Sequence, residues 1–202
     1  MRLPLIITCA LCLTLFACKE KQNSASTEEK TAPVVPLKVE DTSQSYFSIR
    51  EYLNEQWNLK KENPYTLLKV VVVDGKKDSS FVPFDSATWF TMTAPFYAAD
   101  ISDKKYLGWY RFDNFRDEEA EEVHLHYEAI SPDSTMQKMD IAANQYSGLV
   151  NLVYMETRQK SNGVLTSRKM QYRRDDIIQL IEFEKAEGKP AVNRRIEYKF
   201  KY

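Results

Sequence analysis

Two histidines and a glutamate alternate along one short stretch of this chain, and they form its most suggestive chemical grouping. His124, His126 and Glu128 are separated by single residues, and the sequence contains no other histidine. On a β-strand all three side chains would project from one face, where two imidazoles and a carboxylate could bind zinc. The spacing is long for three ligands of one ion, and alternation is equally typical of a half-solvated strand. We therefore favour a strand face with no metal and no cofactor, and keep these three residues as the candidate ligands.

Other catalytic signatures give no assignment. A serine hydrolase needs a nucleophile, a base and an orienting acid, and the Gly-x-Ser-x-Gly elbow is absent. The five glycines form no phosphate-binding loop. The acidic run at 117–122 lacks the spaced ligands and central glycine of a calcium-binding loop. These observations favour a protein without catalytic activity, and the alternative is a hydrolase or metal-dependent enzyme that uses His124 or His126.

A cysteine separates an apolar leader from a polar stretch near the N-terminus. The mostly apolar segment at 3–17 is too short to span a membrane but has the length of a secretory signal. Cys9 and Cys12 lie inside this leader, so its removal would leave Cys18 as the single thiol. A disulfide within one mature chain and a cysteine-rich zinc site would then both be excluded.

The end of the leader, Leu15-Phe16-Ala17-Cys18, resembles the lipobox of bacterial lipoproteins. Leu15 supplies the aliphatic residue three positions before the cysteine, and Ala17 supplies the small residue directly before it. Phe16 is bulkier than the usual middle residue, a departure that recurs in lipoproteins of the Bacteroidetes type. The resemblance implies that residues 1–17 are removed as a signal peptide. It also implies that Cys18 carries a diacylglyceryl group on its thiol and a fatty acid such as palmitate on its amino group.

The same resemblance implies a location. Lys19 follows the cysteine, whereas the enteric pattern for inner-membrane retention has aspartate there, so the cell outer membrane is the expected site. The implied partner is the lipid bilayer, reached through acylated Cys18. Because two or three acyl chains hold far more firmly than one, the protein should be attached to the membrane without spanning it. Whether it faces the periplasm or the cell surface stays open.

The charge balance bears on partners. The chain has 28 lysines and arginines against 29 aspartates and glutamates, a net charge of −1. Proteins that bind nucleic acid need a basic excess, so we expect no nucleic acid. We also see no polybasic patch of the kind that binds anionic lipid.

Composition divides the remaining chain into two parts. Residues 18–45 are rich in lysine, glutamate, serine and threonine and include Pro33 and Pro36, a composition that cannot bury enough surface to order itself. We therefore predict a lipidated cysteine with a disordered tether over 18–45. Residues 46–202 are rich in aromatics and have the length of one globular domain.

The domain is predicted to begin with helices. Ser48 and Glu51 have the capping-box spacing and start a stretch with apolar residues at helical intervals, so we predict a helix over 47–59. Residues 85–102 are also apolar and helix-forming. Because Pro95 is tolerated in a first turn and not in a helix interior, we predict two helical pieces there, with Thr93 capping the second.

Strands make up the rest of the predicted domain. Asp74-Gly75 marks a hairpin between two strands, and from about residue 106 apolar and polar residues alternate between turn signals such as Asn162-Gly163. Short connections between neighbouring strands mean antiparallel pairing. The fold class is therefore α+β, with N-terminal helices packed on a curved antiparallel β-meander, a half-open barrel-like sheet.

An aromatic cluster between residues 89 and 112 has two interpretations. Such clusters are more often core than ligand platforms, and we favour core. Its members are Trp89, Phe90, Phe96, Tyr97, Trp109, Tyr110 and Phe112. In the part at 106–112 the aromatics occupy both faces, which indicates a strand that is covered on each side or one that lines a pocket.

These patterns together predict a membrane-anchored cell-envelope lipoprotein. Its domain would be a binding or scaffolding module that takes an apolar ligand or an envelope protein partner on the concave face of the sheet. One alternative is a small outer-membrane β-barrel, because the chain ends in an alternating, aromatic-terminated strand. Arg168, near the middle of an otherwise apolar strand face, counts against that alternative.

The lipid anchor can be tested directly by removing the acylated thiol. We expect Cys18→Ser to move the protein from the membrane fraction to the soluble fraction of cells, because the variant cannot be lipidated. Fractionation followed by detection of the protein measures this. Unchanged membrane retention of the variant would count against the anchor.

Overall fold

The computed structural model describes residues 45–201, so the predicted signal peptide, Cys18, nearly all of the tether and Tyr202 lie outside the described residues. One helix precedes the first two strands, a second helix follows them, and a meander of strands comes next. The elements are α1 (Ile49–Lys60), β1 (Thr66–Val73), β2 (Lys76–Pro83), α2 (Ser86–Ala98), the short 3₁₀ helix η1 (Lys104–Tyr106), β3 (Tyr110–Asp117), β4 (Glu122–Ala129), β5 (Met136–Asn144), β6 (Val150–Ser161), β7 (Val164–Arg173), β8 (Ile177–Ala186) and β9 (Val192–Lys201). Within residues 45–201, no helix is long and apolar enough to cross a membrane.

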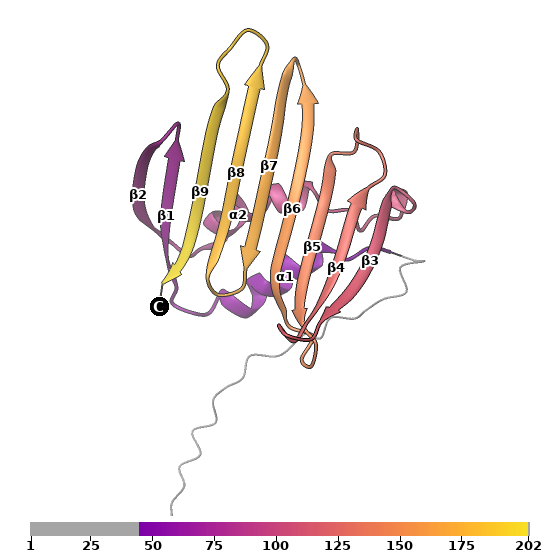
Figure 1. Cartoon of the computed structure of the whole chain (residues 1–202). Helices are drawn as coiled ribbons and strands as arrows, with labels where there is room; N and C mark the ends of the chain where they lie inside the picture. The colour runs from indigo at the N-terminus through magenta and orange to yellow at the C-terminus, as the bar shows by residue number, and fades with distance from the viewer. Residues whose placement is uncertain (1–44, 202) are drawn as a thin grey trace, which may run out of the picture. The chain divides into compact units, whose positions relative to one another are not determined.

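All nine strands belong to one open sheet, in the order β2-β1-β9-β8-β7-β6-β5-β4-β3. Every neighbouring pair is antiparallel. Strands β3 to β9 form a simple meander, and the hairpin of β1 and β2 joins beside β9, so β1 pairs with the last strand of the chain (Figure 1). Both helices lie on the same side of the sheet in Figure 1. The predicted α+β class, with helices and an antiparallel meander, is confirmed.

Helix α1 covers Ile49–Lys60, against a predicted 47–59, and is capped by Ser48 as the sequence predicts. The Ser48 hydroxyl oxygen accepts a hydrogen bond from the Glu51 backbone N–H at 3.2 Å, as a cap should. Ile49 and Leu53 are buried on one side of the helix, and Lys60 in its last turn forms an ion pair with Asp175 in the turn between β7 and β8. The cap, the buried stripe and this ion pair fix the helix at both ends.

The prediction of two helical pieces over 85–102 is wrong, because α2 is one continuous helix. Asp85 caps it by accepting a hydrogen bond from the Thr88 N–H at 2.8 Å. Thr93 is inside the helix, where its hydroxyl donates to the carbonyl of Trp89 at 2.7 Å, and Pro95 lies in the last turn. The proline removes one backbone hydrogen bond near the end of the helix. The buried side chains on both sides of it outweigh that loss, because tertiary packing rather than propensity holds most helices.

The hairpins have the backbone that their sequences predict. Asp74 and Gly75 have φ angles of 47° and 83°, and Asn162 and Gly163 have φ angles of 51° and 77°. Two consecutive residues at positive φ are the requirement of the two-residue turn that matches strand twist. These turns set the registers of β1 with β2 and of β6 with β7.

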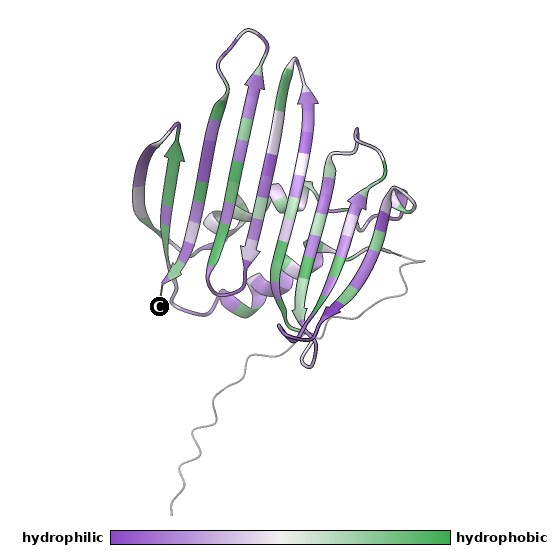
Figure 2. Ribbon diagram, in the orientation of Figure 1, coloured by the Kyte–Doolittle hydropathy of each residue, from purple (hydrophilic) through white to green (hydrophobic). Residues whose placement is uncertain are grey.

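The core lies between the helices and the side of the sheet that faces them. Along the strands, apolar and polar residues alternate, which is visible in Figure 2. The buried side chains on the helix-facing side of the sheet are Leu67, Leu125, Tyr127, Met139, Ile141, Val153, Met155, Met170, Tyr172, Ile178, Tyr198 and Phe200. From the helices, Trp89 contacts Tyr172 at 6.4 Å and Trp57 at 6.0 Å between ring centroids. The chain's own helices therefore occupy the part of the sheet face where the sequence analysis placed a ligand.

Two phenylalanines of α2 provide a matched test of this packing. Phe96 is 0 % exposed and Phe90 is 52 % exposed. We expect Phe96→Ala to lower the free energy of unfolding by about 3–5 kcal/mol, because a large cavity is left in the core. We expect Phe90→Ala to change it by no more than about 0.5 kcal/mol. Urea unfolding of both variants measures this, and equal losses would contradict the placement of α2.

Candidate functional site

The two histidines and the glutamate share one face of β4, the face away from the helices, as the sequence predicts. The structure gives each of them a different partner. His126 Nδ1 is 2.5 Å from Asp140 Oδ1, His124 Nε2 is 3.5 Å from Glu122 Oε2, and Glu128 accepts a hydrogen bond from Arg111 at 2.7 Å. Among residues 45–201 no group of three or more His, Cys, Asp or Glu side chains is placed to hold a metal ion.

The surroundings of these histidines are those of a solvated strand face. The ring of His124 stacks on Phe115 of β3 with centroids 4.7 Å apart and planes parallel within 1°. The cross-strand neighbours of His126 are Asp113 and Asp140. Both neighbours are acids, which can orient an imidazole, and Asp140 is the one that contacts the His126 ring.

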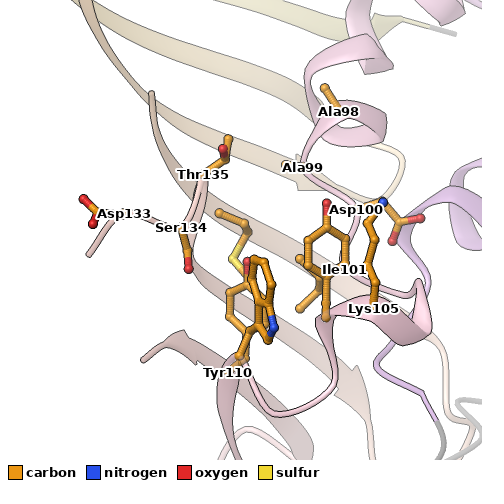
Figure 3. Close-up of a pocket in the computed structure, with 12 residues that line it drawn as sticks. Ala98, Ala99, Asp100, Ile101, Lys105, Tyr110, Asp133, Ser134 and Thr135 are labelled. Carbon is orange, nitrogen blue, oxygen red and sulfur yellow. The ribbon is translucent and has the colours of Figure 1, made fainter. Parts of the chain in front are cut away.

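A pocket of about 330 Å³ lies where the end of α2 approaches the start of β5. Four segments line it: the end of α2 with its following loop, η1, the start of β3, and the loop between β4 and β5. The lining residues are Ala98, Ala99, Asp100, Ile101, Lys105, Tyr106, Trp109, Tyr110, Asp133, Ser134, Thr135 and Met136. Figure 3 shows Ser134 on one side, Ile101 and Lys105 on the other, and Tyr110 between them. The volume is at the small end of the range for ligand sites.

One wall of the pocket is aromatic. The ring of Tyr106 meets Trp109 edge-on at 5.5 Å and Tyr110 at 6.4 Å. Trp109 is 51 % exposed, so its large ring is available to a ligand. Of the two interpretations of 106–112, the lining of a pocket is the one the structure shows. The predicted strand begins only at Tyr110, because Tyr106 belongs to η1.

The backbone around Trp109 is held firmly. Gly108 has a φ of 80°, which turns the chain between η1 and β3. Its N–H donates to the hydroxyl of Tyr46 at 3.0 Å, and that hydroxyl donates to the carbonyl of Tyr110 at 3.2 Å. The Trp109 N–H donates to the carbonyl of Tyr106, and its carbonyl accepts from Ile130, both at 2.9 Å. The exposed ring is therefore presented from an ordered turn.

Two of the three charged groups of the lining, Asp100 and Lys105, have ion-pair partners, and the third, Asp133, is exposed. The Asp100 carboxylate is 3.5 Å from Arg50 and accepts two hydrogen bonds from Ser102, at 3.0 and 3.2 Å. Lys105 Nζ is 3.2 Å from Asp103, which itself is outside the lining. Because the charges of Asp100 and Lys105 are compensated, the pocket offers a ligand mainly aromatic and apolar surface, with the Asp133 carboxylate at its exposed side.

Burial changes the pKa of two tyrosine hydroxyl groups, one in the lining of the pocket and one behind it. Burial raises the pKa of Tyr110 to about 12 and also raises the pKa of Tyr127, which lies on the neighbouring strand, to about 12. Neither phenol serves as a base near neutral pH. Both act there as uncharged aromatic surface and hydrogen-bonding groups.

No family model matches the chain, and neither the curated proteins nor the solved structures contain a significant match to it. The site therefore has to be judged on its geometry. Sequence reasoning offered a pocket lining as one of two interpretations of 106–112, but for the aromatic cluster as a whole it favoured core, to which Trp89, Phe96 and Tyr110 do belong. It missed Asp100 and the segment 133–136, because only the folded chain brings these residues to that wall.

The raised phenol pKa values predict a loss of stability at high pH. Below pH 10 the tyrosines are neutral in both states; above it they ionise first in the unfolded chain, because their pKa is about 12 in the folded one. The free energy of unfolding should therefore fall as pH rises from 10 towards 12. Urea unfolding between pH 9 and pH 11 should show a smaller fall for Tyr110→Phe than for the unaltered protein. The exposed Tyr146→Phe is the control, and identical pH dependence in all three proteins would contradict the burial of Tyr110.

Proposed function

We propose that this protein is a membrane-anchored cell-envelope lipoprotein whose domain binds a ligand and has no catalytic activity. The observation that carries the binding role is Trp109, a half-exposed tryptophan held on an ordered turn at the edge of an open pocket. A large apolar ring that is exposed to water does not contribute the folding free energy that its burial would contribute. Such a ring beside a pocket is typical of a binding surface.

The proposed location is the outer membrane, and the proposed partner is the lipid bilayer, held through acylated Cys18. The support for both is the resemblance of residues 15–18 to a lipobox. A lipid anchor and a separate binding pocket are compatible, because a tether leaves the domain free to meet its ligand in water.

The pocket favours a ligand with an apolar ring or chain. Ile101 and Met136 add apolar atoms to the lining, and Asp100 and Lys105 have their charges compensated. Ser134 and Thr135 supply hydroxyl groups for orientation. An envelope protein that presents an apolar side chain would use the same contacts. The pocket takes over the binding role that the sequence analysis gave to the concave face.

The absence of catalysis is proposed on the positions of the reactive groups. His124, His126 and Glu128 are on the far side of the sheet from the helices; His126 and Glu128 pair with residues of neighbouring strands, and His124 lies near Glu122 of its own strand. None of them belongs to the lining of the pocket. An enzyme would need its catalytic base within reach of the bound ligand, whereas a binding module needs no base there.

Native mass spectrometry of the protein from its own membranes tests the pocket. We expect the unaltered chain to retain a bound molecule and Trp109→Ala to lose it, because the variant removes most of the aromatic wall. Phe90→Ala is the matched control, since Phe90 is equally exposed on α2 but outside the lining.

The mass of the retained molecule would separate a small apolar ligand from a protein partner. Retention by Trp109→Ala as strong as by Phe90→Ala would exclude this pocket as the binding site. Retention that disappears after His124→Ala with His126→Ala would favour the enzyme alternative instead.

A further inference from the structure

The face of the sheet away from the helices is divided by charge. On β8, β9, β1 and β2, one set of side chains points away from the helices. This set contains Glu197, the residues aligned with it on the neighbouring strands, and every second residue along each strand from those positions. We call this surface the cationic face. Its charged residues are the cations Lys77, Lys185, Arg195, Lys199 and Lys201 and the carboxylate of Glu197.

The single carboxylate does not cancel this charge. Glu197 is buried and is held by three groups of the same face. It accepts a hydrogen bond from Gln179 at 2.9 Å, and it lies 3.2 Å from Lys199 and 3.3 Å from Arg195. The cations Lys77, Lys185 and Lys201 surround this group, so the surface keeps a net positive charge.

Apolar side chains alternate with the cations across the strands. One row of paired residues runs Lys77, Val72, Arg195, Ile181, and a second row runs Phe81, Leu68, Lys199, Ile177. Phe81 is 69 % exposed and Ile181 is 42 % exposed. Each row therefore sets exposed apolar groups beside long cationic side chains.

The other half of the same face has a different pattern. On β3 to β6, Arg111 pairs with Glu128 at 2.7 Å and Lys138 pairs with Asp140 at 3.0 Å. Cations and acids compensate each other across β3 to β5, whereas β6 and β7 add the outward cations Arg158, Lys160, Lys169 and Arg173 beside the acid Glu156. The positive charge is thus concentrated on β8, β9, β1 and β2 and continues onto β7, and it is balanced by acids towards β3.

We propose that the cationic face docks the domain onto an anionic phospholipid surface. Lysine and arginine side chains can extend to phosphate groups while their stems and the apolar residues between them contact the lipid boundary. Each cation near an anionic surface favours binding about fivefold. An open sheet offers these groups on a broad surface, which suits a bilayer better than it suits a narrow acidic peptide.

The choice of a bilayer as the occupant rests in part on the proposed lipid anchor. A random-coil tether of residues 18–45 would reach on the order of 30 Å, which keeps the domain beside the membrane that holds the anchor. Even weak attraction is then effective, because tethering makes the second contact intramolecular. The docking itself needs no anchor and can be measured without one.

The sequence analysis found no polybasic patch, and the fold corrects that expectation. The cations come from β2, β8 and β9. Strand β2 is far from the other two in the sequence, and within a strand the cations alternate with other residues. Pairing of β1 with both β2 and β9 brings them to one surface. A scan for consecutive lysines and arginines cannot detect such a patch.

Vesicle flotation of the chain from residue 18 onward, carrying Cys18→Ser, tests the docking without the leader or the lipid. We expect binding to vesicles of phosphatidylglycerol mixed with phosphatidylcholine, little binding to phosphatidylcholine alone, and loss of binding at high salt. Lys77→Gln with Lys199→Gln should weaken binding by about 25-fold, because two cations are removed. Lys61→Gln with Lys104→Gln is the matched control, since it removes the same charge from two exposed positions, directly after α1 and on η1.

Equal weakening by the two pairs would overturn the proposal, as would the absence of binding to the anionic vesicles. Phe81→Ala distinguishes a lipid from an acidic protein partner. Weaker vesicle binding by Phe81→Ala supports contact with the lipid boundary. Unchanged vesicle binding together with binding to soluble polyglutamate would assign the face to an acidic protein and overturn the lipid proposal. Because the test protein has no anchor, the anchor is judged separately by the Cys18→Ser fractionation, in which a high-salt wash of the membranes first removes protein held only by charge.

Discussion

The structure depends on covering one face of an open sheet, and Tyr172 is at the centre of that cover. It lies on β7, near the middle of the strand order, and is fully buried. Its ring meets Tyr52 of α1 at 5.8 Å and Trp89 of α2 at 6.4 Å, and its hydroxyl donates to Gln56 at 3.2 Å. One side chain of the sheet thus contacts both helices. Since α2 is positioned by this contact, so is the loop that follows it, and that loop forms one side of the pocket.

Because the helices take one face, the other face has to be stable in water, and its two halves achieve this differently. Cross-strand pairs of opposite charge, as in β3 to β6, each contribute roughly 0.2–1 kcal/mol to a sheet. The half formed by β8, β9, β1 and β2 gives up most of that contribution, because its cations outnumber its acids. Exposed Phe81 and Ile181 add no stability to the isolated domain either. The fold does not need these cations and exposed apolar residues for its stability. We therefore look for the function of this half of the face in a contact with another molecule.

Features that are encoded locally could be predicted from the sequence, and features that depend on distant contacts could not. Ser48 as a cap and the turns at Asp74-Gly75 and Asn162-Gly163 follow from the preferences of a few neighbouring residues. The local rule for Pro95 failed because the packing of α2 outweighs one lost hydrogen bond. The shared face of His124, His126 and Glu128 was predictable from alternation alone. The partners of His126 and Glu128, Asp140 and Arg111 on neighbouring strands, were not, because a cross-strand partner depends on register. The pocket shows both cases: its aromatic wall is local, and its opposite side comes from residues 133–136.

The two proposed surfaces lie near opposite edges of the sheet, and this arrangement lets them work together. The pocket is beside β3, which is one edge strand, and the cationic face includes β2, which is the other. Neighbouring strands are about 4.8 Å apart, so the edges are separated by on the order of 40 Å. Contact with a bilayer through the cationic face would therefore leave the pocket, beside the opposite edge, open to its ligand. The edges are also protected against pairing with other chains, by Lys76, Lys77 and Pro83 on β2 and by alternating charges such as Arg116 and Asp117 on β3. Because its edges are protected, the sheet can stay open and present both surfaces. A closed sheet would bring the two sites together.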